Sequence, residues 1–98
     1  MKREELRSKY VGLLNKMAEL YEARGASRKA IASYKALIET DPLLEGAYQR
    51  LMTLYSNLGK RSAALKVYDA CRKAVEAELE TEPDKVTTSL YKKILESS

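Results

Sequence analysis

The chain has 98 residues, of which 45% are hydrophobic and 33% charged, and its 18 Lys and Arg against 14 Asp and Glu give a formal net charge of +4. This is the length of one small domain and the composition of a folded chain rather than a disordered one. The sequence has no apolar run of the roughly 18 residues needed to cross a membrane and no secretory signal, so we expect a cytoplasmic protein that does not bind a membrane.

With no His and a single Cys, the chain has almost no means of forming a transition-metal site or a nucleophile and base pair. We therefore expect a protein that is not an enzyme and that uses no metal or cofactor. Cys71 has no partner for an internal disulfide and falls on an apolar helical stripe, where a free cysteine usually packs as a small hydrophobic residue.

Taken in chain order, apolar residues at steps of three and four predict a first helix over 3–23 and a second over 27–40. Gly25 suits the end of the first helix, and Ser27 is the predicted cap of the second. The apolar face of the first helix is predicted to consist of Leu6, Tyr10, Leu13, Leu14, Met17, Leu20 and Tyr21. The second helix is predicted to bury Ala30, Ile31, Tyr34, Leu37 and Ile38.

A second helical hairpin is predicted after Pro42, because two further apolar stripes flank Gly59. These stripes are Leu44, Tyr48, Leu51, Met52, Tyr55 and Leu58, then Ala64, Tyr68, Cys71, Val75 and Leu79. Pro83, placed in a first helical turn, would open a fifth helix over 84–96. The apolar residues of that helix are Val86, Leu90, Tyr91, Ile94 and Leu95.

The two hairpins are copies of one another at an offset of 34 residues, at which Gly25 meets Gly59 and Ala30 meets Ala64. This is the period of the tetratricopeptide repeat. We therefore predict an all-α, tetratricopeptide-like right-handed helical repeat array within a single domain, 1–98. Its two repeats cover about 11–44 and 45–78. Since two stacked repeats leave an apolar end exposed, the helix over about 84–96 is interpreted as a C-terminal cap.

Three segments carry a more specific resemblance: DPLLEGAYQRLM at 41–52, LGKRSAAL at 58–65 and ELETEP at 78–83, which runs on to Leu90 and Tyr91. Together they resemble the bacterial transcriptional activator domain. Members of that family commonly have glycine where this chain has Glu80. The resemblance implies a non-catalytic module for protein interaction and oligomerisation in a bacterial transcription regulator, where it normally follows a winged-helix DNA-binding domain that this chain lacks.

The partners implied by the resemblance are proteins: the DNA-binding domain of the same regulator, a second copy in a homodimer, or the transcription machinery. The first helix of each repeat would face the partner on a concave surface. The candidate partner-binding residues on this surface are Asn15, Lys16, Glu19, Gln49, Arg50 and Thr53. They lack the lysine and asparagine set with which some tetratricopeptide domains hold a terminal carboxylate. A stand-alone peptide-binding adaptor is the alternative function, and ordinary solvated surface is the alternative for the residues.

Two clusters of charged residues are further candidate sites. Arg24, Arg28, Lys29, Lys60 and Arg61 are predicted to share one edge, which would suit phosphates. Basic residues also serve solubility at helix ends, so direct nucleic-acid binding by this chain is not expected. Glu76, Glu78, Glu80, Glu82 and Asp84 form an acidic link without the pattern of a calcium loop, and a solvated turn is the better interpretation.

Overall fold

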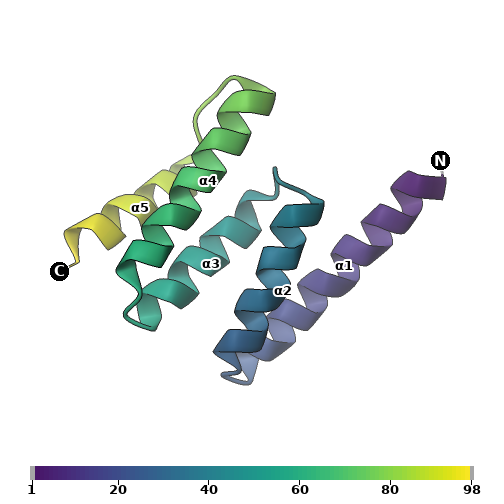
Figure 1. Ribbon diagram of the computed structural model, residues 1–98, viewed down its shortest axis with the longest axis horizontal. Coiled ribbons are helices and arrows are strands. Elements are labelled where there is room, and N and C mark those ends of the chain that lie inside the picture. The colour runs from purple at the N-terminus through teal and green to yellow at the C-terminus, as the bar shows by residue number, and fades with distance from the viewer. Residues whose placement is uncertain (1, 98) are drawn as a thin grey trace.

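The computed structural model describes residues 2–97, which form five α-helices and no strand. The helices are α1 (Lys2–Ala23), α2 (Ser27–Thr40), α3 (Glu45–Asn57), α4 (Arg61–Leu79) and α5 (Lys85–Glu96) (Figure 1). The pairs α1/α2 and α3/α4 are helical hairpins, α2 joins them by packing on α3, and α5 packs on both α3 and α4. The predicted all-α array of two hairpins and a capping helix is confirmed.

The two hairpin turns have the same geometry. Gly25 and Gly59 have φ values of 75° and 76°, in the left-handed region that glycine enters without a steric cost. After each glycine, the amide of the next residue donates to a carbonyl five residues earlier, from Ala26 to Tyr21 and from Lys60 to Tyr55, both at 2.8 Å. These bonds satisfy carbonyls at the helix ends. The residue at the cap position of α2 is Ala26, and no side-chain bond caps this helix. The prediction that Ser27 caps it was therefore wrong, because Ser27 is its first helical residue.

The core is continuous across both hairpins. Between the first hairpin and α3, the fully buried residues include Ala18, Tyr34, Leu37 and Leu51. Across α3 and α4, Tyr48 packs with Cys71 and Val75, and Met52 packs with Ala64. Most residues predicted to be buried on α2, α3 and α4 are buried, whereas Leu58 and Leu79 near the helix ends are exposed.

The link between α4 and α5 differs from the prediction in one detail. α4 runs on to Leu79 as expected and ends at Glu80, whose φ of 53° and ψ of 38° are left-handed. The family's usual glycine would adopt this conformation more easily than glutamate. Pro83 is buried and precedes the helix instead of lying in its first turn, so that prediction was wrong. Asp84 is the true cap, and its carboxylate accepts from the Thr87 amide at 3.0 Å.

Four kinds of contact fix α5 on the second hairpin. The side chain of Ile94 is buried against Met52 and Ala64. The rings of Tyr68 and Tyr91 stack with their centroids 3.9 Å apart. The Arg61 guanidinium donates to the carbonyls of Ile94 and Leu95 at 3.1 and 2.9 Å, satisfying acceptors at the helix end. The fourth contact is a buried polar cluster around Thr87.

The polar cluster joins the beginnings of α3 and α5. The Thr87 hydroxyl is fully buried and donates to the Glu45 carboxylate at 2.9 Å, while it accepts from the Gln49 amide at 2.9 Å. Glu45 also accepts from the backbone amide of Asp84 at 3.0 Å. The Thr87 hydroxyl also lies 3.2 Å from the Asp84 carboxylate of its own helix cap, but its bonds with Glu45 and Gln49 form only when α5 is in register with α3. The cluster therefore favours this docking position of the capping helix.

The first helix buries less than its sequence suggests. Of its predicted apolar face, only Leu14 and Tyr21 pack against the core, together with Val11 and Ala18. The remaining members are exposed to solvent: Leu6, Tyr10, Leu13, Met17 and Leu20. Within residues 2–97, α1 packs closely against α2 alone, so one whole side of the helix has no neighbour.

Candidate functional site

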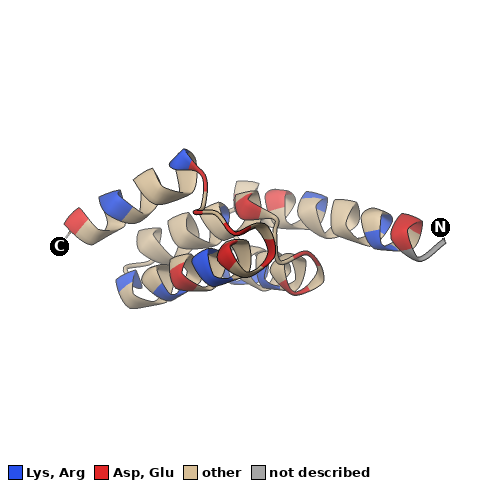
Figure 2. Ribbon diagram, turned by 90° about the horizontal axis from the view of Figure 1, so that it is seen from above, with Lys and Arg blue, Asp and Glu red and all other residues tan. Residues whose placement is uncertain are grey.

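A groove opens between α1 and α3, which lie in the same layer of the molecule, with α2 and α4 in the other (Figures 1 and 2). Its volume is about 830 Å³. Gly12 and Gly46 face each other's helices across the groove, and a methyl group added to either would meet nothing within 4 Å. The absence of side chains at these two positions therefore widens the groove.

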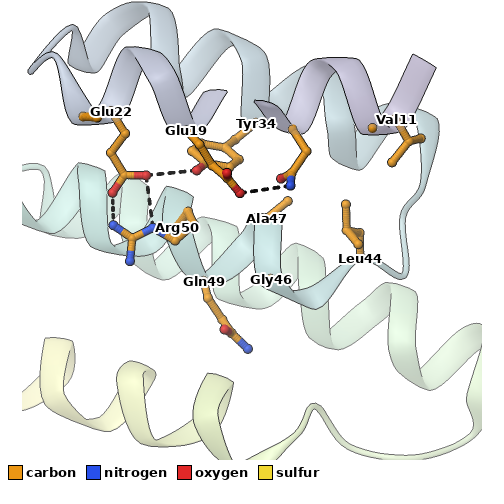
Figure 3. A pocket seen from close by; sticks show the side chains of 12 residues that line it. Val11, Glu19, Glu22, Tyr34, Leu44, Gly46, Ala47, Gln49 and Arg50 are labelled. Carbon is orange, nitrogen blue, oxygen red and sulfur yellow. Dashed lines mark hydrogen bonds and ion pairs between the residues drawn. The ribbon is translucent and has the colours of Figure 1, made fainter. Parts of the chain in front are cut away.

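Five polar residues of this groove form two separate sets of contacts (Figure 3). The Glu22 carboxylate forms an ion pair with Arg50 and accepts from the Tyr34 hydroxyl at 2.9 Å. Nearby, the Asn15 amide donates to Glu19 at 3.1 Å. Burial raises the pKa of Tyr34, and the Glu19 carboxylate adds to this effect. Tyr34 therefore acts here as a neutral hydrogen-bond donor that orients Glu22.

The groove brings together four of the six residues predicted to bind a partner: Asn15, Glu19, Gln49 and Arg50. Lys16 does not line it and lies at a shallow hollow with Leu20 on another side of α1. Thr53 does not line it either, since it faces the space between α3 and α5. Whether any of these six residues binds a partner stays a prediction.

That second space is a groove of about 460 Å³ on the other side of α3. Gln49 and Arg50 lie on the ridge that separates it from the first groove. Its α5 side presents the exposed Val86 and the two lysines Lys85 and Lys93, and no acidic residue lines it. The surface around α3 is therefore acidic towards α1 and basic towards α5.

Four polar residues were not predicted from the sequence to make contacts between helices. Glu22 and Tyr34 lie at the first groove, and Glu45 and Thr87 belong to the polar cluster that joins α3 and α5. Glu22 lies 28 residues from Arg50, and Thr87 lies 42 from Glu45, so no helical spacing relates either pair. Tyr34 was predicted as a core residue, which it is, but its hydroxyl reaches the groove. The stacking of the hairpins brings Glu22 to Arg50, and the docking of α5 on the second hairpin brings Thr87 to Glu45.

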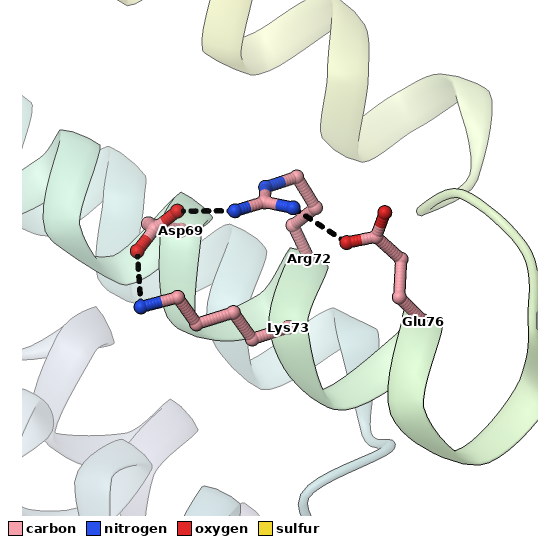
Figure 4. Close-up of polar contacts among 4 residues, drawn as sticks. All are labelled: Asp69, Arg72, Lys73 and Glu76. Atoms are coloured by element: carbon pink, nitrogen blue, oxygen red, sulfur yellow. Dashed lines mark hydrogen bonds and ion pairs between the residues drawn. The ribbon is translucent and has the colours of Figure 1, made fainter.

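Other charged groups of the chain are engaged with one another. On the exposed side of α4, Arg72 bridges Asp69 at 2.9 Å and Glu76 at 2.5 Å, and Lys73 also contacts Asp69 (Figure 4). The hydrogen bond from Arg72 lowers the pKa of Asp69. Such exposed pairs contribute little stability.

The predicted basic edge exists in part. Both hairpin turns lie at the same end of the molecule (Figure 1). Arg61, however, holds the carbonyl groups at the end of α5, and Lys29 lies over the Tyr21 ring at 5.7 Å from its centroid. Two of the five basic residues therefore make contacts within the chain, and the absence of direct nucleic-acid binding stays a prediction.

Neither reactive nor metal-binding groups stand out in the described part of the chain. Burial raises the pKa of the Cys71 thiol to about 12, which keeps it protonated at neutral pH. Within residues 2–97 there is no group of three or more His, Cys, Asp or Glu side chains placed to hold a metal ion. In that same range, no helix has the length and apolar character that crossing a membrane requires.

The fold and the grooves define the class of protein: a helical-repeat scaffold with a polar concave surface. Residues 1–95 match the family model of the bacterial transcriptional activator domain. The chain belongs to this family and is an activator-type domain of transcription regulators. Comparison with curated proteins and with solved structures found no match.

Proposed function

We propose that the chain is a non-catalytic protein-interaction module of a bacterial transcription regulator and that it works in the cytoplasm. The partner would dock on the concave side formed by α1, α3 and α5. In this proposal the chain couples the partner to a DNA-binding domain, as the family resemblance implies.

The observation that carries the proposal is the groove between α1 and α3, together with family membership. The groove has exposed hydrogen-bonding groups on both walls and two glycines that keep it open. Grooves between helices are common sites of peptide and helix recognition. The Arg50 and Glu22 ion pair joins the two walls, so a partner finds a preformed surface and loses less conformational entropy on binding.

A substitution that fills the groove tests the proposal. Gly46→Gln adds a long side chain at an exposed helical position where the added Cβ meets no atom. Ala70→Gln makes a similar change on the exposed side of α4 and serves as the control. Gly46→Gln is a cleaner probe than Arg50→Glu, because Arg50→Glu would also set two carboxylates against each other at Glu22.

The assay is affinity capture from the source cell with the parent chain and both variants, followed by mass spectrometry. We expect the parent chain and Ala70→Gln to retain a DNA-binding regulator or a component of the transcription machinery. We expect Gly46→Gln to lose it while its circular dichroism stays helical and its melting temperature does not fall, since glutamine favours a helix more than glycine does. Equal retention by all three proteins, or no transcription protein retained by the parent chain, would count against the proposal.

A further inference from the structure

The outer side of α1 carries a long apolar stripe open to solvent. The stripe consists of Leu6, Tyr10, Leu13, Met17 and Leu20, whose exposed fractions run from 39% to 67%. Their steps of four, three, four and three residues repeat a seven-residue pattern, which is the pattern of a seam between two helices. Contiguous exposed apolar surface of this kind marks an interaction site on a soluble domain.

The internal repeat shows what such a stripe packs against. Shifted by 34 residues, Tyr10, Leu13, Met17 and Leu20 correspond to Leu44, Ala47, Leu51 and Leu54 on the second hairpin. All four of these residues pack into the core formed with the first hairpin. The stripe on α1 is thus the side of a repeat that normally meets a neighbouring helix, presented without one.

We propose that this stripe is a dimer interface and that its occupant is the same stripe of a second copy. End-to-end stacking of copies is blocked, because α5 already covers the far end of the array through Ile94, Met52 and Ala64. A second copy can instead pair with the first about a two-fold axis, with the two α1 helices antiparallel. Leu13, in the middle of the stripe, then lies near this axis. A two-fold interface is self-complementary and closes at two copies.

The exposed area agrees with a weak dimer. Large side chains exposed to this degree present on the order of 100 Å² each, so the stripe offers about 500 Å² of mainly apolar surface, within the range of functional patches on monomers. Pairing two stripes buries about 1,000 Å², close to the lower limit for a specific interface. We therefore expect a dimer that forms at high concentration and dissociates on dilution.

The charges beside the stripe give the dimer a characteristic salt dependence. Lys9 and Lys16 follow the stripe along one edge, and neither takes part in the ion pairs found within residues 2–97. An antiparallel two-fold pairing sets this edge against the same edge of the second copy, so the lysines repel. Added salt screens that repulsion and strengthens the apolar contact, so dimerisation increases with salt. An acidic partner would show the opposite dependence.

The dimer proposal rests on the proposed function, because it identifies one protein partner as a second copy of the chain. The dimer interface lies on a side of α1 away from the groove, so the two proposals can fail independently. A monomeric chain leaves the capture experiment with Gly46→Gln intact, and a failed capture leaves the dimer measurable with the purified chain alone.

The experiment is sedimentation equilibrium of the purified chain over a wide range of concentrations at low and high salt. We expect a species of twice the 11.1 kDa chain mass at high concentration. Leu13→Lys should weaken dimerisation by about tenfold or more, equivalent to about 1.4 kcal/mol. Leu79→Lys is the matched control, because Leu79 is 57% exposed against 61% for Leu13 and lies at the end of α4. It should dimerise as the parent chain does.

A second variant tests the geometry. Leu13→Cys should form a disulfide between two copies under mild oxidation, since the two residues meet near the axis, while the buried Cys71 does not react. Leu79→Cys should not cross-link. A parent chain that stays monomeric at the highest concentration overturns the proposal and assigns the stripe to a different helical protein. Equal dimerisation of Leu13→Lys and the parent chain overturns it as well.

Discussion

Ile94→Ala is the sharpest test of how α5 holds the array together. The Ile94 side chain is 3% exposed and packs against Met52 and Ala64, so its truncation leaves a cavity between three helices. Truncations of this kind cost about 2–5 kcal/mol, a large part of the about 5–15 kcal/mol that stabilises a small domain. Taking about 3 kcal/mol, the melting temperature should fall by about 12–24 °C, since each kcal/mol shifts it by about 4–8 °C at this size.

Leu95→Ala is the matched control, because Leu95 is the next residue of the same helix and is 41% exposed. The control should cost less than about 1 kcal/mol, since surface truncations leave no cavity. Neither change touches the backbone carbonyls that accept from Arg61. The assay is thermal and urea unfolding followed by circular dichroism. If Ile94→Ala destabilises the chain no more than Leu95→Ala, α5 is not docked as the structure describes, and the capping argument is wrong.

Thr87→Val removes the buried hydroxyl that bridges α3 and α5, and we expect the free energy of unfolding in urea to fall by about 1–3 kcal/mol; an unchanged value would contradict the polar cluster. The Thr87 amide holds the pKa of Asp84 below its ordinary 3.8. The stabilisation from ionised Asp84 is therefore present above about pH 4 and is lost as the pH falls through the depressed value, so Asp84→Asn, which keeps a good cap, should flatten the acid limb of a stability profile. Glu80→Gly should raise the free energy of unfolding by about 1 kcal/mol by relieving a left-handed conformation, whereas Glu80→Ala should give no such gain. Cys71 should react with a thiol reagent only when the chain unfolds, because the thiol is buried and protonated; rapid labelling of the native protein would show that the α3/α4 core opens.

The number of helices, the positions of the turns and the family could all be predicted from the amino-acid pattern. Apolar residues at helical spacing and the offset of 34 between Gly25 and Gly59 are local or periodic patterns. Such patterns can be recognised in a sequence without knowledge of the fold. Asn15 and Gln49 lie one repeat apart and both line the groove, as the repeat predicts. The equivalent pairs Lys16 with Arg50 and Glu19 with Thr53 each have one member outside it. The fifth helix was recognisable as a cap because two repeats leave an apolar end to cover.

Which apolar residues are buried and which polar residues meet depends on how the helices pack. The stripe around Leu13 has the same spacing as a buried face, so only the absence of a neighbouring helix separates the two. The pairs Glu22 with Arg50 and Glu45 with Thr87 join different helices at separations that no period relates. Their contact depends on how the hairpins and α5 are stacked, since a polar side chain finds its partner through the packing of the elements and not through its local sequence.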